Sequence, residues 1–312
     1  MEYRTLGRTG LRASVMGIGA GGPSRLGQRD NIRSESESID LVLQALDAGV
    51  NFIDTAEGYR TEEIVGAAVA RRDRDRIIIS TKKSLGRENI SREVLRAGLR
   101  ESLSRLGADY IDIYHLHGLR LEQYDYYSQE IVPELQDLKQ QGLIRCIGVT
   151  EHWNGDLEHK MLQRALKDDV WDVIMVGFNL LNQSARETVL RTAREKDIGV
   201  LIMFALRRAL SGPDKLRATV RTLIERGEVN PDEIDSEDPL GFLPAEGSAV
   251  SIPDTAYRFC QAEAGAHVIL SGTGNPGHLA ANLASFARPP LPREDIQRLK
   301  HIFRDVTSVT GQ

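Results

Sequence analysis

The sequence predicts an α/β protein in which eight parallel strands and the helices between them close into a (β/α)8 barrel, the TIM barrel architecture. Short β-rich runs alternate with longer segments of helical period along most of the chain, which is typical of parallel strands joined by helical crossovers. The length of 312 residues also suits one such barrel. We therefore expect a single barrel domain over residues 1–312, with an irregular insertion at about 207–252.

Eight runs have the composition of buried strands, and the segments between them show apolar residues three and four positions apart, several ending at Gly. The expected strands are 14–19, 51–56, 77–81, 111–117, 146–150, 173–178, 199–204 and 267–272. The expected helices are 37–49, 62–72, 91–107, 132–142, 157–168, 184–196 and 254–265. A short hairpin is expected before the first strand. Periodicity alone does not show whether the first and last strands pair, so an open doubly wound sheet is the alternative fold.

The strand and helix rhythm breaks between Arg207 and Ile252, where a charged helical piece precedes the segment NPDEIDSEDPLGFLPAEG. The Pro, Gly and acidic residues of this segment indicate an irregular insertion after the seventh strand. Loops at that end of a barrel strand border the active face. The insertion therefore either has a functional role or is a solvated loop without one.

Composition and charge exclude several kinds of partner. Hydrophobic residues make up 41% of the chain and charged residues 27%, as in ordinary globular proteins. The formal net charge of -5 gives no general attraction for nucleic acid or anionic membranes, and no window approaches the roughly 20 apolar residues of a spanning helix. The first residues lack the apolar stretch of a signal peptide, and Cys146 and Cys260 have no metal-binding spacing. We therefore expect a cytoplasmic protein whose partner is a small molecule.

Ionisable side chains gather at the C-terminal ends of three successive predicted strands, the end at which barrels carry their reacting groups. Asp54 lies near the end of the second strand, and Tyr59 follows five residues later in the loop. Lys82 ends the third strand and His117 ends the fourth. Because neighbouring strand ends meet in a barrel, the sequence predicts that these four side chains share one site.

These residue types suit the reduction of a carbonyl group. Its oxygen develops negative charge as hydride reaches the carbon, so it needs a proton donor, and we expect Tyr59 to be that donor. A phenol has a pKa of about 10, which a nearby Lys82 ammonium would lower by stabilising the phenolate. Asp54 would hold the ammonium in place, and neutral His117 would hydrogen-bond to the substrate oxygen.

The segments NFIDTAEGY, STK and IDIYHLH resemble those that carry the Asp, Tyr, Lys and His tetrad of the aldo/keto reductase superfamily. RCIGVTEHW resembles that family's fifth-strand motif, and SGTGNPGHLAANLASF resembles its cofactor-phosphate loop and the helix after it. The opening EYRTLGRTGLRASVMGIGAGG resembles the family's start, where a hairpin closes the barrel floor. The resemblance implies a reductase that interconverts an aldehyde or ketone and its alcohol, with NADP or NAD as cofactor and no metal.

Two of the motif residues have neighbours that leave alternatives open. Side chains alternate along a strand, so only one of Lys82 and Lys83 can point inward, and we expect Lys82. A Schiff-base aldolase or lyase barrel would instead use Lys82 or Lys83 as its nucleophile. His115 and His117 have the spacing of a metal pair, but no further His or Cys pair ends a neighbouring strand, so we expect His115 in a lower barrel layer. A nucleotide-sensing regulatory subunit is the third alternative.

Two glycine-rich segments compete for the cofactor phosphates. Gly17, Gly19 and Gly22 match the dinucleotide pattern G-x-G-x-x-G, but no helix follows at once. We therefore expect Gly19 in the first strand-end loop, where the backbone can approach the nicotinamide. SGTGNPGH leads from the eighth strand into a helix whose free N–H groups and dipole favour anions. The residues expected to line this phosphate site are Gly272, Thr273, Gly274 and Asn275.

The cofactor positions that the resemblance implies are altered in several places. Thr150 is followed by Glu151, where the family usually has an Asn that holds the carboxamide. Met175 stands where Gln is common. Gly272 and His278 replace basic residues that often bind the 2'-phosphate of NADP, which weakens a strict preference for NADP.

Further cofactor positions lie just beyond the seventh strand. Arg207 and Arg208 either supply the missing charge through charge-assisted hydrogen bonds to phosphate, or are solvated or paired with the acidic insertion. Met203 and Phe204 compete for the place of the residue that stacks on the nicotinamide, and the pattern does not decide between them. The remaining positions that the resemblance implies are Leu206 and Asn282.

Overall fold

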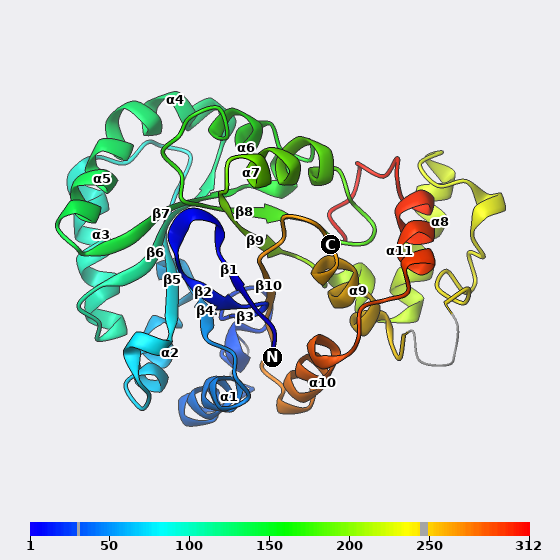
Figure 1. The fold of residues 1–312 in the computed structure, drawn as a ribbon, viewed down its shortest axis with the longest axis horizontal. Helices are drawn as coiled ribbons and strands as arrows, with labels where there is room; N and C mark the ends of the chain where they lie inside the picture. Colours follow the sequence, from blue (N-terminus) through cyan, green and yellow to red (C-terminus); the bar gives the residue numbers. More distant parts are fainter. Residues whose placement is uncertain (30–31, 244–248) are drawn as a thin grey trace.

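A computed structural model describes residues 1–29, 32–243 and 249–312. Eight parallel strands form a closed barrel in the order β10-β3-β4-β5-β6-β7-β8-β9 (Figure 1). Because β10 pairs in parallel with both β3 and β9, the first and last strands of the barrel are joined, and the open-sheet alternative is wrong. The barrel strands are β3 (Met16–Gly19), β4 (Phe52–Asp54), β5 (Ile78–Ser84), β6 (Ile111–Leu119), β7 (Ile144–Glu151), β8 (Val173–Gly177), β9 (Gly199–Met203) and β10 (Val268–Ser271).

Helices surround the barrel, most of them between successive strands, so the alternation predicted from the sequence is confirmed (Figure 1). Ser34 and Glu37 form a capping box at the start of the first helix, and Gly107 ends the third in the left-handed conformation. Among the described residues, no helix has the length and apolar character needed to cross a membrane. The helices are α1 (Glu35–Asp47), α2 (Glu62–Val69), α3 (Arg92–Leu106), α4 (Tyr124–Tyr126), α5 (Val132–Gln140), α6 (Lys160–Ala165), α7 (Arg191–Glu195), α8 (Pro213–Glu225), α9 (Ile252–Gln261), α10 (Pro276–Ala287) and α11 (Arg293–Ile302).

An antiparallel hairpin precedes the barrel and is formed by β1 (Tyr3–Thr5) and β2 (Arg12–Ser14). Apolar residues of the hairpin, Leu6 and Leu11 among them, belong to the same buried cluster as Phe52 of β4. This cluster fills the barrel interior near the N-terminal ends of the strands, and Figure 1 shows the hairpin in blue beside them. The predicted closure of the barrel floor by a hairpin is confirmed.

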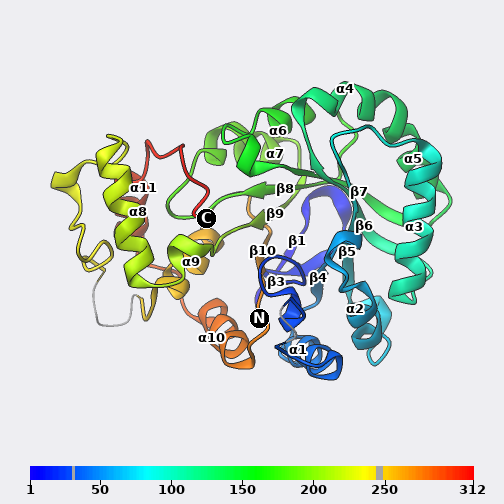
Figure 2. The same ribbon diagram turned by 180° about the vertical axis from the view of Figure 1, so that it is seen from behind.

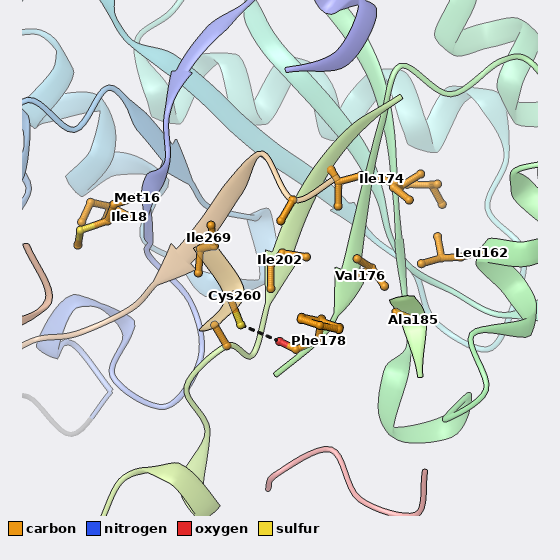
Figure 3. Packing of buried hydrophobic residues seen from close by; sticks show 14 of the residues in the cluster. Met16, Ile18, Leu162, Ile174, Val176, Phe178, Ala185, Ile202, Cys260 and Ile269 are labelled. Atoms are coloured by element: carbon orange, nitrogen blue, oxygen red, sulfur yellow. Dashed lines mark hydrogen bonds between the residues drawn. The ribbon is translucent and has the colours of Figure 1, made fainter. Parts of the chain in front are cut away.

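A second apolar layer lies between the strands and the helices. Ile174 and Val176 of β8 belong to it together with Leu162 of α6 (Figure 3). Each such side chain contributes about 1.5–3 kcal/mol when it is fully buried. In the same layer the thiol of Cys260 donates to the carbonyl oxygen of Phe178 at 3.7 Å. Both cysteines of the chain are buried and free.

After β9 the chain leaves the barrel rhythm, in the region predicted as an insertion. The charged helical piece of that prediction is α8, which buries its apolar face. Glu233, in the turn that follows, forms an ion pair of 3.1 Å with Arg304, just beyond α11. The insertion therefore lies against the C-terminal segment, and Figure 2 shows both at one side of the barrel. Residues 244–248 of the predicted insertion lie outside the described residues.

Candidate active site

Side chains along β5 alternate between the barrel interior and the helices, and this alternation decides which of them reach the barrel mouth. Ile78 belongs to the interior cluster, and Ser80 and Lys82 follow it on the same side. Lys83 faces the helices, where its Nζ lies 3.1 Å from Glu57. The structure therefore places Lys82 inside the barrel and Lys83 outside it.

Asp54 and Lys82 form a buried ion pair just below the mouth. The Lys82 ammonium lies 2.5 Å from Asp54 Oδ2 and donates to the Thr55 carbonyl oxygen at 2.6 Å. The Ser80 hydroxyl donates to the other carboxylate oxygen at 2.7 Å. Burial raises the pKa of Asp54 and lowers the pKa of Lys82, while their mutual attraction opposes both shifts. The ammonium is thus held in one position by two acceptors.

Tyr59 ends a short 3-10 turn after β4, and its ring lies close to this ion pair. The Lys82 Nζ is 5.1 Å from the ring centroid, and the Tyr59 hydroxyl is 3.3 Å from His117 Nε2. Gly21 leaves room for the ring, because a Cβ at that position would overlap it. Sequence reasoning missed Gly21, whose only signal is the pair of glycines after the first barrel strand. The structure brings all four predicted catalytic residues together at one site.

The pKa of Tyr59 differs from the expectation. Burial raises the pKa of its hydroxyl above the ordinary value, the Asp54 carboxylate raises it further, and Arg25 opposes these effects. The Lys82 ammonium bonds to Asp54 rather than to the tyrosine, so Asp54 offsets part of its charge. The pKa of Tyr59 is therefore raised on balance rather than lowered as predicted. At neutral pH Tyr59 is an uncharged phenol that can donate its proton.

The two histidines of β6 are both uncharged at neutral pH. Burial, together with the nearby Lys82 charge, lowers the pKa of His117 to about 3. His115 lies one layer deeper, where its Nε2 is 3.1 Å from the Ser80 hydroxyl and burial lowers its pKa well below the ordinary value. Gly148 leaves space for the His115 ring. Over the part of the chain that the structure describes, no group of three or more His, Cys, Asp or Glu side chains could hold a metal ion.

A cavity of about 320 Å³ lies between α9 and α10, beside the loop after β10. This volume suits the adenosine part of a dinucleotide. A Cβ on Gly272 would lie 2.9 Å from the Gly19 carbonyl oxygen, so the first and last strand ends approach closely next to the cavity. Ser251 and Arg288 also line it and had no signal in the sequence, whereas Ser285, which lines it too, belongs to the segment that resembles the family's phosphate-loop helix. Five predicted cofactor residues line the cavity: Leu206, Gly272, Thr273, His278 and Asn282.

The first N–H groups of α10 are capped by the side chain of Asn275. The Asn275 side-chain oxygen accepts hydrogen bonds from the backbone N–H groups of Gly277 at 2.8 Å and His278 at 3.3 Å. The first helical residue is Pro, which has no N–H group. The prediction that free N–H groups of this helix bind phosphate is therefore wrong. In the loop before it, the backbone amides of Thr273 and Gly274 donate to no other described residue, and they are the donors that a phosphate could use.

Glu151, which stands where the family usually has the Asn that holds the carboxamide, points away from the barrel interior. Its buried carboxylate lies 2.8 Å from His159 Nδ1 and accepts a hydrogen bond from the Gly177 N–H group at 2.8 Å. These two contacts engage the carboxylate on the outer side of β7, so the structure does not place Glu151 at the barrel mouth with the other predicted cofactor residues. Thr150 accepts a hydrogen bond from the Gly118 N–H group at 2.7 Å.

The structure separates the two candidates for the residue that stacks on the nicotinamide. Met175 belongs to the interior cluster and Met203 packs against it. Phe204, at a φ of 65°, stacks on Trp153 with ring centroids 6.0 Å apart. The Arg207 guanidinium lies 3.6 Å from the Phe204 centroid. The Phe204 ring is therefore already engaged, whereas Met203 lies on the inner side of the barrel wall.

The Arg207 guanidinium is held by uncharged groups. It donates to Asn154 at 3.1 Å, to Thr310 at 2.9 Å and to the side chain of Gln312 at 2.5 Å. Burial lowers the pKa of Arg207 to about 10. Among the described residues, no carboxylate of the insertion pairs with it, so that alternative is wrong there. Arg208 is exposed.

A closed barrel with Tyr, Lys, Asp and His side chains at one mouth and a nucleotide-sized cavity beside it defines a nicotinamide-dependent oxidoreductase. A model of the Aldo/keto reductase family matches residues 16–304. The NADH-specific methylglyoxal reductase of Escherichia coli (strain K12) is 32% identical over 233 residues, which cover 67% of this chain and 69% of that protein. The aldo-keto reductase YhdN of Bacillus subtilis (strain 168) is 30% identical over 340 residues, covering 99% of this chain and 95% of its own.

The fold is shared with solved structures. The holo form of an aldo-keto reductase from Bacillus halodurans superposes with a TM-score of 0.75 at 23% identity, covering 97% of this chain and 96% of that chain. The chain belongs to the aldo/keto reductase family. It is an oxidoreductase that interconverts an aldehyde or ketone and its alcohol by hydride transfer with a nicotinamide cofactor.

Proposed function

We propose that Tyr59 is the proton donor of this reaction and that Lys82, Asp54 and His117 create its environment. The observation that carries the proposal is the distance of 3.3 Å between the Tyr59 hydroxyl and His117 Nε2. Two groups so close can bind the same substrate oxygen. The Lys82 ammonium, 5.1 Å from the tyrosine ring, lies near enough to stabilise a phenolate.

The residues act in a defined order during reduction. A bound nicotinamide cofactor supplies the hydride to the carbonyl carbon. As negative charge develops on the substrate oxygen, the Tyr59 hydroxyl donates its proton, and the neutral His117 ring donates a hydrogen bond from Nε2. Lys82 stabilises the phenolate that results, and Asp54 keeps the ammonium charged and in place. When an alcohol is oxidised, the Tyr59 phenolate takes the proton back.

The lysines are poorly placed for the Schiff-base alternative. A nucleophilic amine must be neutral and must face the substrate. Lys82 donates to Asp54 and to the Thr55 carbonyl oxygen, and Lys83 pairs with Glu57 outside the barrel. We expect borohydride to trap no adduct between the protein and a carbonyl substrate, whereas an aldolase or lyase would be labelled on one of these lysines.

For the cofactor we propose NADP or NAD, without strict preference for NADP. Of the side chains that line the cavity, His278 and Arg288 can carry positive charge. Arg288 already lies 3.6 Å from Asp254, which reduces its attraction for a 2'-phosphate. A relative whose name states that it is NADH-specific supports the same proposal.

Oxidation of NADH and NADPH with a set of small aldehydes and ketones tests the proposed function. We expect turnover on the order of 1–100 per second with at least one substrate. Fluorescence titration of each nucleotide separately should give dissociation constants within about tenfold of each other. Tight binding of both nucleotides without turnover would contradict the proposal and would support the regulatory subunit.

A further inference from the structure

The turn that follows β3 connects the catalytic tyrosine with the cofactor loop. This turn comprises residues 21–28. At its start, a Cβ on Gly21 would overlap the Tyr59 ring. The Arg25 N–H group donates to the Gly21 carbonyl oxygen at 3.3 Å. Arg25, at a φ of 43°, and Leu26, at a φ of 57°, are both left-handed, a conformation that residues with a Cβ rarely adopt. Such strain persists only where the surroundings impose it, and it is common near ligand sites.

The other end of the turn is fixed to the loop after β10. A Cβ on Gly274 would lie 2.5 Å from the Gly27 nitrogen, so the two backbones are in contact. The Arg33 Nε donates to the Gly274 carbonyl oxygen. Leu26 is buried, and the Ser38 hydroxyl donates to its carbonyl oxygen at 2.8 Å. These contacts hold the turn between Tyr59 and the loop that borders the cavity.

Arg25 is half-buried in this turn, and none of the described residues pairs with its side chain. Within the described residues its guanidinium makes no hydrogen bond and no ion pair, whereas the guanidinium of Arg33 binds both Gly274 and Glu37. The Arg25 charge acts on the proposed proton donor. Burial raises the pKa of Tyr59, and the Arg25 charge opposes this shift. The charge of Lys82 is paired with Asp54, whereas no described carboxylate pairs with Arg25. Arg25 therefore adds positive charge at this side of the mouth.

We propose that Arg25 binds the pyrophosphate group of the nicotinamide cofactor. The inference rests on the proposed function, because the nicotinamide must then reach Tyr59 while the adenosine lies in the cavity beside Thr273. The pyrophosphate joins those two parts, and the turn joins the same two places in the protein. An unpaired guanidinium forms strong, bidentate, charge-assisted hydrogen bonds with phosphate oxygens.

A carboxylate on the substrate is the other anion that could reach Arg25. The position of the turn argues against it. The turn begins at Gly21 beside the Tyr59 ring and reaches Gly274 at Gly27, next to the cavity, and Arg25 lies two residues from Gly27 but four from Gly21. The two possibilities differ in which dissociation constant the arginine controls.

Fluorescence titration of the Arg25→Gln variant with NADH and with NADPH tests the proposal. We expect both dissociation constants to rise about tenfold, because both cofactors carry the pyrophosphate. Added salt should weaken binding to the wild type more than to the variant. Arg29→Gln removes the same charge from an exposed position just after the turn and should leave both constants within about twofold. Arg25→Lys should keep most of the affinity, which would separate a loss of charge from a disturbed turn.

Three results would overturn the inference. If Arg25→Gln binds both nucleotides like the wild type, the guanidinium does not contact the cofactor, and the proposed function still stands. If the variant raises only the KM of the carbonyl substrate, Arg25 binds the substrate instead. If the wild type binds neither nucleotide, the inference and the proposed function both fail.

Discussion

The two halves of the barrel mouth hold their polar groups in different ways. Over β4, β5 and β6, functional side chains bond directly to one another, as Lys82 does to Asp54. Over β7 to β10, several side chains at expected cofactor positions are engaged elsewhere: Glu151 pairs with His159, and Asn275 caps the start of α10. The first half matches the family's residues in type and order, and the second departs from them.

This difference indicates which positions tolerate change in such a barrel. In the first half the buried charges of Asp54 and Lys82 depend on each other, so a single substitution leaves the partner uncompensated. In the second half, loops and backbone groups surround the cofactor cavity, and their side chains can vary while the fold is kept. We therefore expect large effects on turnover in the first half, and separable effects on binding or stability in the second.

The largest effect is expected for Lys82→Met, which leaves the Asp54 carboxylate buried without its partner. Turnover should fall by about a hundredfold to ten-thousandfold, and the free energy of unfolding by about 3–5 kcal/mol. Steady-state kinetics and denaturant unfolding measure the two. The double variant with Asp54→Asn should recover stability but not turnover. A single variant as stable as the wild type would show that the pair is not buried.

Gly21→Ala should disturb the first half without removing a functional group. The added methyl group would overlap the Tyr59 ring and move its hydroxyl away from His117. We expect turnover at saturating cofactor to fall by about tenfold to a hundredfold. Gly86→Ala is the matched control, because the nearest atom to a Cβ there is 4.0 Å away. Equal rates for the two variants would mean that Gly21 does not position the tyrosine.

In the second half, Glu151→Gln should separate stability from cofactor binding. The substitution removes the charge that pairs with His159, so we expect the free energy of unfolding to fall by about 1–3 kcal/mol. The dissociation constant for NADH or NADPH should change by less than about twofold, because the carboxylate lies outside the mouth. Glu158→Gln, at an exposed neighbouring position, serves as the control for stability. A strong loss of cofactor affinity would return Glu151 to the cofactor site.

The smallest expected effect concerns pH. The pKa of His117 is lowered to about 3 in the folded protein, whereas an unfolded histidine has a pKa of about 6.5. Below the unfolded pKa the unfolded chain binds a proton that the folded site does not, so stability decreases as the pH falls from about 6.5 toward 3. His117→Asn should therefore reduce the loss of unfolding free energy between pH 7 and pH 5 by about 1–2 kcal/mol. An identical loss in both proteins would contradict the buried, neutral state of His117.

The barrel and the placement of its first half could be predicted because their signals are local in sequence. Strand and helix periods fix the order of the elements, and the alternation along β5 separates Lys82 from Lys83. Asp54, Lys82 and His117 each lie at a strand end that the pattern already marks. Parallel packing then brings them together without further information.

Five predicted cofactor residues of the second half do line the cavity, but other features of the mouth could not be predicted because they depend on contacts between distant segments. Arg33 meets Gly274 across 241 positions of sequence, and no local pattern pairs them. The pKa of Tyr59 depends on how deeply the folded chain buries it, which a motif does not record. The left-handed conformation of Arg25 likewise has no signal, since the residue is not Gly or Asn.

The proposed reaction depends most directly on the Tyr59 hydroxyl as the proton donor. Tyr59→Phe removes that hydroxyl and keeps the ring that packs over Gly21 and near Lys82. Measured side by side with the wild type, turnover should fall by at least about a thousandfold, while the dissociation constants for NADH and NADPH stay within about twofold. A Tyr59→Phe enzyme that turns over at the wild-type rate would contradict the proposed role of Tyr59.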